Sequence, residues 1–436
     1  MTPWETRALY QGYAYAYPHK TAYRTLVPPV PLETLWADEN RDALFLYVHI
    51  PFCEMRCGFC NLFTTIHADQ SLEDAYMDTL ERQARRVRES IGDVSIARLA
   101  VGGGTPTYLS LENLTRLFDL LESNYDINSD VPTSVETSPQ TSEMPKLALL
   151  KARGVDRISI GVQSFIESEV HAVGRPQTTG EVCAALDRIR AVGFDTLNLD
   201  LIYGIPGQTQ ATWIESIQQA LVWQPEELYL YPLYKRPFTG LDRMRPHDWD
   251  DERVALYRAG RDFLLERGYT QVSMRMFRAA HAPTQDAPVY CCQDDGMIGL
   301  GCGARSYTRT LHYSSEWAVT YGSVRAILAD YIQRDTESFA VAAYGCPLDD
   351  EEQQRRYAIK SLLHAEGLSR PEYEQRFGIS LDQTLPELAD LVNRDLAAWD
   401  DKVLHLTPAG VERSDAIGPW LYSDAVKKSM QLYEIK

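Results

Sequence analysis

The sequence predicts an α/β protein: a partial (β/α)6 barrel of the TIM type, followed by a smaller C-terminal α+β module that resembles a winged helix. Six apolar runs of strand length lie between residues 43 and 234, and stretches with helical periodicity separate most of them. Buried strands that alternate with helices favour a parallel sheet. About six such units favour an open barrel over a Rossmann sheet, although periodicity alone does not separate the two. After about residue 345 the sequence pattern changes and predicts short helices followed by a short β-wing, VLHLTPAGVE.

The elements follow in order along the chain. Strands are expected at 43–50, 97–103, 133–138, 157–165, 196–205 and 227–234. Helices are expected at 72–91, 144–154 and 180–193, and the last two close on Gly154 and Gly193, which suit the position after a helix C-terminus. These elements divide the chain into a Tyr/Pro-rich, irregular arm (1–44), a barrel core (45–240), an α/β extension that completes the core (241–344) and the C-terminal module (345–436).

Composition limits the classes of function. The 436 residues are 44% hydrophobic and 24% charged, which is typical of a globular chain, and the net charge is −18. An acidic protein repels phosphate backbones, so no nucleic-acid partner is expected. Residues 341–436 carry 11 basic and 17 acidic side chains, so the winged-helix module is expected to pack or cap a substrate rather than read DNA. The sequence starts without a secretory signal and contains no run of 18 apolar residues, so no membrane span is expected. Eight cysteines are too few for a disulfide scaffold. The expected location is therefore the cytoplasm.

Three cysteines gather directly after the first expected strand: Cys53, Cys57 and Cys60, with the spacing C-x3-C-x2-C. Active sites of α/β barrels are built at this end of the strands. Three thiolates on one loop can ligate three irons of a [4Fe–4S] cluster and leave the fourth iron open, and Gly58 allows a tight loop. Two other interpretations stay open on spacing alone: a zinc site with His49 as a fourth ligand, and three free thiols.

These residues carry a resemblance to a known family. The stretch YVHIPFCEMRCGFC resembles the signature of radical S-adenosylmethionine (SAM) enzymes. Within them it is similar to the oxygen-independent coproporphyrinogen III oxidase group, which includes haem chaperones and class C methyltransferases. The stretches GGGTPTYL, ETSP, RISIGVQSF and NLDLIYGIPGQT follow in the family's order up to about Thr209, and weaker similarity continues through RRYAIKSLLHAEGL.

The resemblance implies a fold, cofactors and chemistry. A reduced [4Fe–4S] cluster held by the three cysteines passes an electron to SAM, and the resulting 5′-deoxyadenosyl radical takes a hydrogen atom from the substrate. One or two SAM molecules, a porphyrinogen or haem as the small molecule, and an electron donor such as flavodoxin or ferredoxin are implied. The implied reaction is oxidative decarboxylation of porphyrinogen propionates.

Candidate SAM contacts lie at the strand ends. Taken alone, Gly103, Gly104 and Thr105 form either a tight turn or a ligand site, and Glu136 is either a salt-bridged residue or a partner for hydroxyl groups. The resemblance implies that the glycine turn meets the SAM amino group and that Glu136 bonds the SAM hydroxyls.

The other candidates have similar alternatives. Gln163 is a buried amide or a SAM contact, and Arg175 forms an internal ion pair or binds the SAM carboxylate. Asp200 supports the fold or meets SAM. Tyr47 and Phe59 are core residues or pack near the cluster and adenine. In each case the resemblance implies the second role.

The sequence also departs from the family pattern. Leu62 stands where the coproporphyrinogen enzymes have a further cysteine, and the stretch from Asp286 to Cys291 lacks the haem-linked pattern of the chaperones. Cys291, Cys292 and Cys302 form a second group that is either functional or simply apolar. Three functions therefore remain: a porphyrinogen-decarboxylating enzyme, a radical SAM enzyme on another substrate (including methyl transfer), and a haem-binding chaperone.

Overall fold

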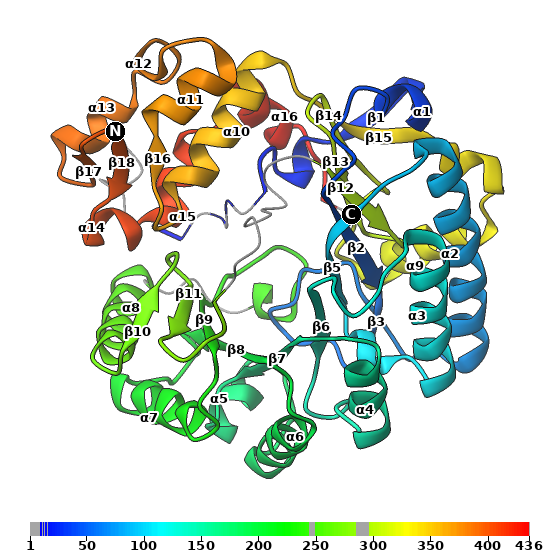
Figure 1. Cartoon of the computed structure of the whole chain (residues 1–436). Coiled ribbons are helices and arrows are strands. Elements are labelled where there is room, and N and C mark those ends of the chain that lie inside the picture. The colour runs from blue at the N-terminus through cyan, green and yellow to red at the C-terminus, as the bar shows by residue number, and fades with distance from the viewer. Residues whose placement is uncertain are drawn as a thin grey trace.

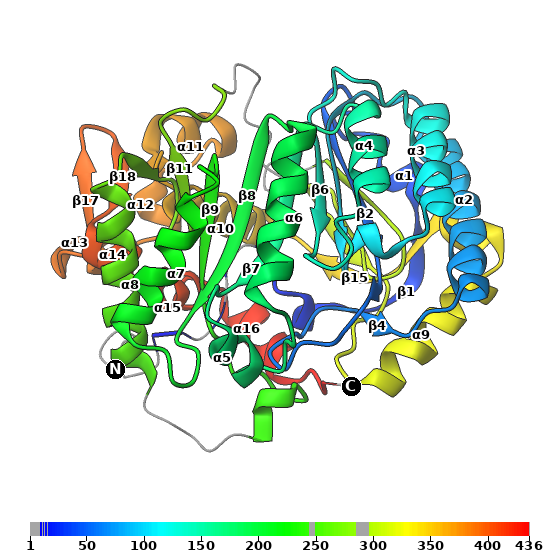
Figure 2. The ribbon, with the colours of Figure 1, turned by 90° about the horizontal axis from the view of Figure 1, so that it is seen from below.

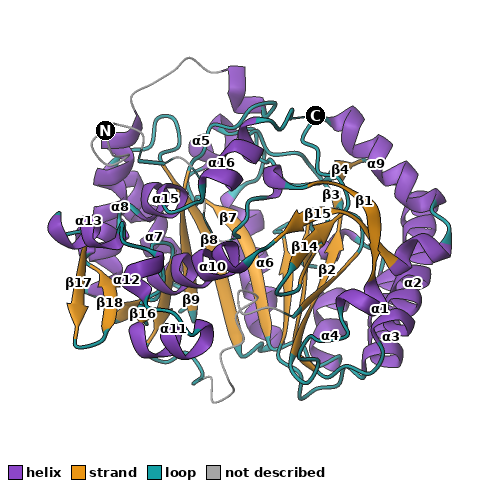
Figure 3. Cartoon of the chain, turned by 90° about the horizontal axis from the view of Figure 1, so that it is seen from above, coloured by secondary structure: helices purple, strands orange, loops and turns teal. Residues whose placement is uncertain are grey.

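Figure 1 shows a computed structural model of the chain, which describes residues 9–435 except 11, 13, 15, 244–248 and 285–295. One mixed sheet organises most of it, in the strand order β1-β15-β14-β13-β12-β2-β5-β6-β7-β8-β9-β11-β10. The helices of the core lie on the outer face of this curved sheet (Figures 2 and 3).

Six parallel strands form the barrel core, and each coincides with an apolar run expected from the sequence. They are β2 (Leu44–Ile50), β5 (Ile96–Gly103), β6 (Thr133–Thr137), β7 (Arg157–Gln163), β8 (Thr196–Tyr203) and β9 (Glu227–Pro232). The helices that follow them in turn are α2 (Gln70–Ile91), α3 (Leu111–Tyr125), α4 (Met144–Ala152), α6 (Thr179–Val192), α7 (Gln210–Leu221) and α8 (Trp249–Leu265). This βα order confirms the predicted partial barrel.

Local signals explain where the helices begin and end. The Asp69 side chain accepts a hydrogen bond from the Leu72 amide and so caps α2, and Thr178 forms a reciprocal capping box with Glu181 at the start of α6. Gly154 and Gly193 follow α4 and α6 with φ of 79° and 76°. These are the left-handed values that favour glycine after a helix, as the sequence predicted.

Further strands, most of them antiparallel, extend the sheet on both sides of the barrel core. Beyond β9 come β11 (Met276–Ala279) and β10 (Tyr269–Gln271). On the other side β12 (Met297–Leu300) runs parallel to β2 and leads to β13 (Arg305–Tyr307), β14 (Leu311–Ser314), β15 (Val341–Pro347) and β1 (Arg24–Pro31). Part of the arm that we expected to be irregular is therefore a sheet strand, because β1 pairs with β15. The remaining elements are α1 (Leu32–Leu35), β3 (Phe52–Cys53), β4 (Thr65–Ile66), α5 (Glu167–Ala172), α9 (Tyr321–Gln333) and the short turns η1 (Lys20–Ala22), η2 (Pro106–Tyr108), η3 (Gly240–Arg243) and η4 (Thr336–Ala340).

The C-terminal part forms a separate small α+β unit with its own hydrophobic core, as the sequence predicted. It comprises α10 (Asp350–Leu362), β16 (Leu368–Ser369), α11 (Arg370–Phe377), α12 (Leu381–Thr384), α13 (Leu388–Asn393), β17 (Ala397–Asp400), β18 (Val403–Leu406), α14 (Pro408–Val411), α15 (Ser414–Trp420) and α16 (Asp424–Gln431). Its antiparallel sheet has the order β16-β18-β17, and Ala14, Tyr17 and Ala22 of the N-terminal segment enter its core. In the described part of the chain, no helix combines the length and apolar character that crossing a bilayer requires.

Candidate functional site at the carboxyl ends of the barrel strands

The three cysteines lie on the loop that leaves β2, at the carboxyl end of the parallel strands. Neighbouring loops hold this loop closely: the Gly58 amide donates to the Val173 carbonyl (2.8 Å), and the Leu241 amide donates to the Gly58 carbonyl (2.9 Å). A Cβ atom on Gly58 would lie 2.8 Å from the Val173 oxygen. The tight loop predicted from Gly58 is therefore explained by the close approach of other segments.

The thiols contact polar groups of the barrel. Cys53 Sγ lies 3.2 Å from Thr105 Oγ1, and Arg175 Nη1 donates to Cys57 Sγ at 3.2 Å. Burial raises the pKa of Cys53 and of Cys60. Three soft sulfur donors on one loop suit iron–sulfur chemistry, in which the metal takes the place of the thiol proton. The donor set therefore fits a cluster with three protein ligands.

The zinc interpretation finds no support in this geometry. His49 Nε2 lies 2.9 Å from the Phe63 carbonyl, and Nδ1 lies 3.3 Å from the Tyr47 hydroxyl, so both ring nitrogens have partners. Burial lowers the pKa of His49 to about 4. Among the described residues, no three His, Cys, Asp or Glu side chains converge on the position of a single metal ion.

The glycine turn after β5 is packed against the cysteine loop. The Gly104 amide donates to Ile50 and the Thr105 amide to Phe52, both at 2.7 Å. A Cβ atom on Gly104 would lie 2.4 Å from the Phe52 oxygen and 3.1 Å from Cys53 Sγ. The glycines are thus needed first for the approach of the protein's own backbone, a reason that the sequence analysis did not foresee.

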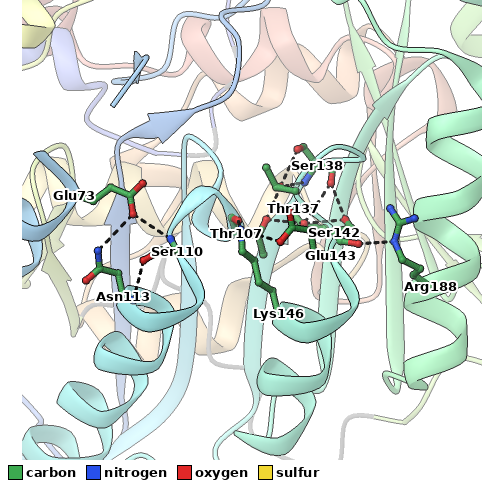
Figure 4. A network of polar contacts seen from close by, with 11 residues as sticks. Glu73, Thr107, Ser110, Asn113, Thr137, Ser138, Ser142, Glu143, Lys146 and Arg188 are labelled. Atoms are coloured by element: carbon green, nitrogen blue, oxygen red, sulfur yellow. Dashed lines mark hydrogen bonds and ion pairs between the residues drawn. The ribbon is translucent and has the colours of Figure 1, made fainter. Parts of the chain in front are cut away.

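Buried hydroxyl groups hold the chain just after this turn (Figure 4). Thr107 Oγ1 lies 2.7 Å from the hydroxyl oxygens of both Thr137 and Thr141, and Lys146 Nζ donates to the Thr107 carbonyl at 2.9 Å. Ser142 in turn lies 3.0 Å from Thr137. The network ties the turn to the end of β6 and the start of α4, so the turn and the neighbouring strand end keep a fixed relative position.

Acidic side chains line the inside of the barrel. The Gly103 amide donates to Glu136 Oε2 at 3.2 Å, and Asn198 Nδ2 donates to Asp200 Oδ1 at 2.8 Å. Desolvation and the charge of Asp200 raise the pKa of Glu136 to about 7, and desolvation raises the pKa of Asp200 to about 6. Glu136 is accessible yet surrounded by protein, which fits a carboxyl that lines a lumen.

Gln163 ends β7, and Arg175 bonds to the backbone of the same strand end. Gln163 has φ of 70°, which is unusual for a residue with a side chain and typical of functional sites, and it lies at an irregularity in the β7–β8 pairing. Arg175 donates to the Gly161 carbonyl (2.8 Å) and to Gln177 Oε1 (2.7 Å), in addition to Cys57. The buried guanidinium is therefore bound to the cysteine loop and to the strand end at once.

Of the two aromatic candidates, one lies on β2 and the other within the cysteine loop. Tyr47, on β2, is half-buried next to His49. Phe59 packs against a small apolar group at the ends of β8 and β9, which consists of Val173, Ile202, Ile205, Leu233 and Leu241. The twelve residues predicted for the cluster and SAM lie on β2, β5, β6, β7 and β8, on the segments that follow β2 and β5, and on the loop after α5.

The structure adds residues that the sequence analysis missed. Arg157 pairs with Glu227 at 2.8 Å and donates to Ser134 Oγ at 2.9 Å inside the barrel, and the rings of Tyr229 and Tyr231 stack with centroids 5.8 Å apart. Polar residues that alternate with apolar ones in TSVET, RISIG and LNLDL were the signal for this polar lumen.

The second cysteine group does not join this site in the described residues. Cys291, Cys292 and the segment from Asp286 lie outside the described residues. Cys302 is fully buried, and its amide donates to the Tyr76 hydroxyl at 3.1 Å.

Comparison with known proteins agrees with this geometry. Residues 47–220 match the model of the radical SAM superfamily, and residues 348–412 match the HemN C-terminal domain. The chain is 30% identical to the haem chaperone HemW of Bacillus subtilis, covering 84% of this chain and 95% of the relative. It is 28% identical to the oxygen-independent coproporphyrinogen III oxidase of Salmonella typhimurium, covering 92% of each. The crystal structure of coproporphyrinogen III oxidase (HemN) from Escherichia coli superposes with a TM-score of 0.77 at 25% identity, covering 92% of this chain and 96% of that one.

Proposed function

Since the chain belongs to the radical SAM superfamily, in the family of oxygen-independent coproporphyrinogen III oxidases and HemW haem chaperones, we propose that it oxidatively decarboxylates propionate groups of a porphyrinogen. The observation that carries the proposal is the cysteine loop beside the carboxyl ends of the barrel strands, where Arg175 donates to Cys57 and Thr105 contacts Cys53.

The cofactors of this superfamily are a [4Fe–4S] cluster and SAM. In the proposal Cys53, Cys57 and Cys60 ligate three irons and leave the fourth open to SAM. When bound, the two cofactors supply a one-electron reduction that ends in removal of a hydrogen atom from the substrate. The side chains described here bind, orient and shield these groups from water.

Each candidate then has a chemical task. The SAM amino group is a donor, so the carbonyl oxygens of the turn at Gly103 and Gly104 suit it better than the amides, one of which already bonds Ile50. The Glu136 carboxylate accepts hydrogen bonds from vicinal hydroxyls, and Asp200 and Gln163 present further polar atoms on the next strands. Arg175 places a positive charge beside Cys57, where the SAM carboxylate is expected.

The remaining two candidates position the cofactors. Tyr47 borders the cysteine loop through its contact with His49, and Phe59 covers the apolar side near Val173 and Leu241. An external donor such as flavodoxin or ferredoxin supplies the electron in this proposal.

The test is anaerobic. The protein is reconstituted with iron and sulfide, reduced, and given SAM with or without coproporphyrinogen III, and 5′-deoxyadenosine and CO2 are quantified. A strong rise of both with the porphyrinogen is expected. Cleavage that ignores the porphyrinogen contradicts the proposed substrate, and S-adenosylhomocysteine among the products would indicate methyl transfer.

A haem chaperone is the second candidate. The similarity to the Bacillus subtilis HemW covers nearly all of that relative, and Leu62 is largely exposed where the oxidases have a further cysteine. A Soret band on addition of haem, without any 5′-deoxyadenosine that depends on porphyrinogen, would favour this candidate.

A further inference from the structure

Several positively charged side chains gather beside the cysteine loop, although the whole protein carries a net charge of −18. Lys20 comes from the N-terminal segment, Arg236 from the loop after β9, and Arg305 from the start of β13. Burial, then the positive charges of Arg305 and Arg236, lowers the pKa of Lys20; the nearby Cys60 acts in the opposite direction. Lys20, Arg236 and Arg305 are called the cationic group below.

The backbone fixes this group against the cysteine loop. The 236–241 loop is bonded to it through the Leu241 amide and the Gly58 carbonyl, 2.9 Å apart. The segment after β14 is bonded to the cysteine loop, because Arg56 of that loop donates to the Val319 carbonyl. Lys20 packs against this segment from the N-terminal part of the chain, with its Nζ 3.8 Å from the centre of the Trp317 ring. Two segments that are distant in sequence, which carry Lys20 and Arg236, are therefore held beside the cysteine loop.

Contacts of Tyr433 with Trp317 fix the aromatic ring on which Lys20 packs. The Tyr433 hydroxyl donates to the Trp317 carbonyl at 2.6 Å, and the two rings lie 6.0 Å apart. The N-terminal segment runs beside α16 of the C-terminal module (Figure 1). Within the described residues no carboxylate forms an ion pair with Lys20, so its ammonium lies among other cations and an aromatic face. Such a position is costly to build unless an anion occupies it.

We propose that the cationic group around Lys20 is a subsite for a carboxylate of the substrate. This inference rests on the proposed function, because a porphyrinogen with propionate groups supplies such carboxylates. The cationic group comes from the N-terminal segment, the loop after β9 and β13, whereas the proposed SAM contacts Glu136 and Asp200 come from β6 and β8. A carboxylate anchored by Lys20 would hold one edge of a large substrate while another edge faces the cofactors.

The test measures binding directly. Coproporphyrin III, the stable oxidised tetracarboxylic acid, is titrated into the holoprotein and compared with its tetramethyl ester, with fluorescence as the readout. Lys20→Met keeps the side-chain length over Trp317, Lys20→Arg keeps the charge, and Lys402→Met removes a charge from the exposed turn between β17 and β18. Lys20→Met is expected to weaken binding of the acid by about tenfold to a hundredfold and to leave ester binding unchanged. Lys20→Arg and Lys402→Met should bind the acid like the wild type.

Other outcomes overturn the inference. They are a wild type that binds acid and ester equally or not at all, and a Lys20→Met variant with unchanged affinity for the acid. Two further results for Lys20→Met would assign its charge to another role. A shifted reduction potential of the cluster with normal acid binding means that Lys20 neutralises charge on the cluster. Weaker binding of SAM alone means that Lys20 binds SAM. Cleavage of SAM by the reduced wild-type protein without porphyrin is measured in parallel. If the wild type does not cleave SAM, that result counts against the proposed function rather than against the carboxylate subsite.

Discussion

The two sides of the candidate site are built differently. On the barrel side, Cys53 follows β2, and Glu136, Gln163 and Asp200 come from β6, β7 and β8 of the same parallel sheet. On the closing side, Lys20, Arg236, Arg305 and Trp317 come from segments brought together by long-range contacts. Neighbouring parallel strands end at the same edge, so sequence order alone places the first set. Only tertiary packing places the second.

The largest effect is expected on the barrel side. Cys57→Ala removes one of three thiols and should abolish cluster assembly and all cleavage of SAM, because three ligands are needed to hold the cluster with one iron open. Iron and sulfide content and 5′-deoxyadenosine are the measurements. Cys183→Ala, on α6, is the matched control and should behave like the wild type. A Cys57→Ala protein with full iron content and activity would refute the assignment of the triplet.

The next largest effect concerns the attachment of the C-terminal module to the barrel. Asp415 of α15 pairs with Arg275 just before β11 and also accepts from the Tyr234 hydroxyl, and both members of the pair are almost fully buried. Asp415→Ala removes the carboxylate that faces a buried guanidinium and should lower the free energy of unfolding by about 3–5 kcal/mol. Chemical denaturation of the apoprotein measures it.

An exposed ion pair in the same module provides the control. Asp382 pairs with Arg370 at the surface, so Asp382→Ala should cost less than about 1 kcal/mol. Equal losses for the two variants would show that the buried pair does not attach the module to the barrel.

The comparison also explains how much the sequence predicted. The six strands and the position of the cysteine loop could be predicted, because apolar period and βα order are local properties. The candidate SAM contacts were implied by the family resemblance. The contact of Arg175 with Cys57 could not, because no local pattern says that the loop after α5 closes on the cysteine loop. The strand formed by residues 24–31 was missed because its partner, β15, lies some 300 residues later in the chain. The cationic group was missed for the same reason.

A smaller effect tests the role of the glycine turn. In Gly104→Ala the new Cβ would lie 2.4 Å from the Phe52 oxygen, so the turn and the cysteine loop must separate. Overpacking of this kind costs about 1–3 kcal/mol, and cluster content should fall with it. Gly322→Ala is the control, because its Cβ meets nothing within 4 Å at the start of α9, and its stability should be unchanged or slightly higher. Normal cluster content in Gly104→Ala would mean that the close contact is dispensable.

The smallest effect is a pH dependence of SAM binding. The pKa of Glu136 is raised to about 7, so its carboxylate is largely protonated at pH 6 and largely ionised at pH 8. The ionised form is the better acceptor for hydroxyl donors, so SAM affinity should fall by about tenfold between pH 8 and pH 6. Glu136→Gln keeps the shape without the titration, and its affinity should be weaker at pH 8 but nearly independent of pH over this range. Calorimetric titrations of the oxidised holoprotein measure both. If the variant kept the full pH dependence, the titrating group would lie elsewhere, and Asp200, whose pKa is raised to about 6, would be the next to substitute.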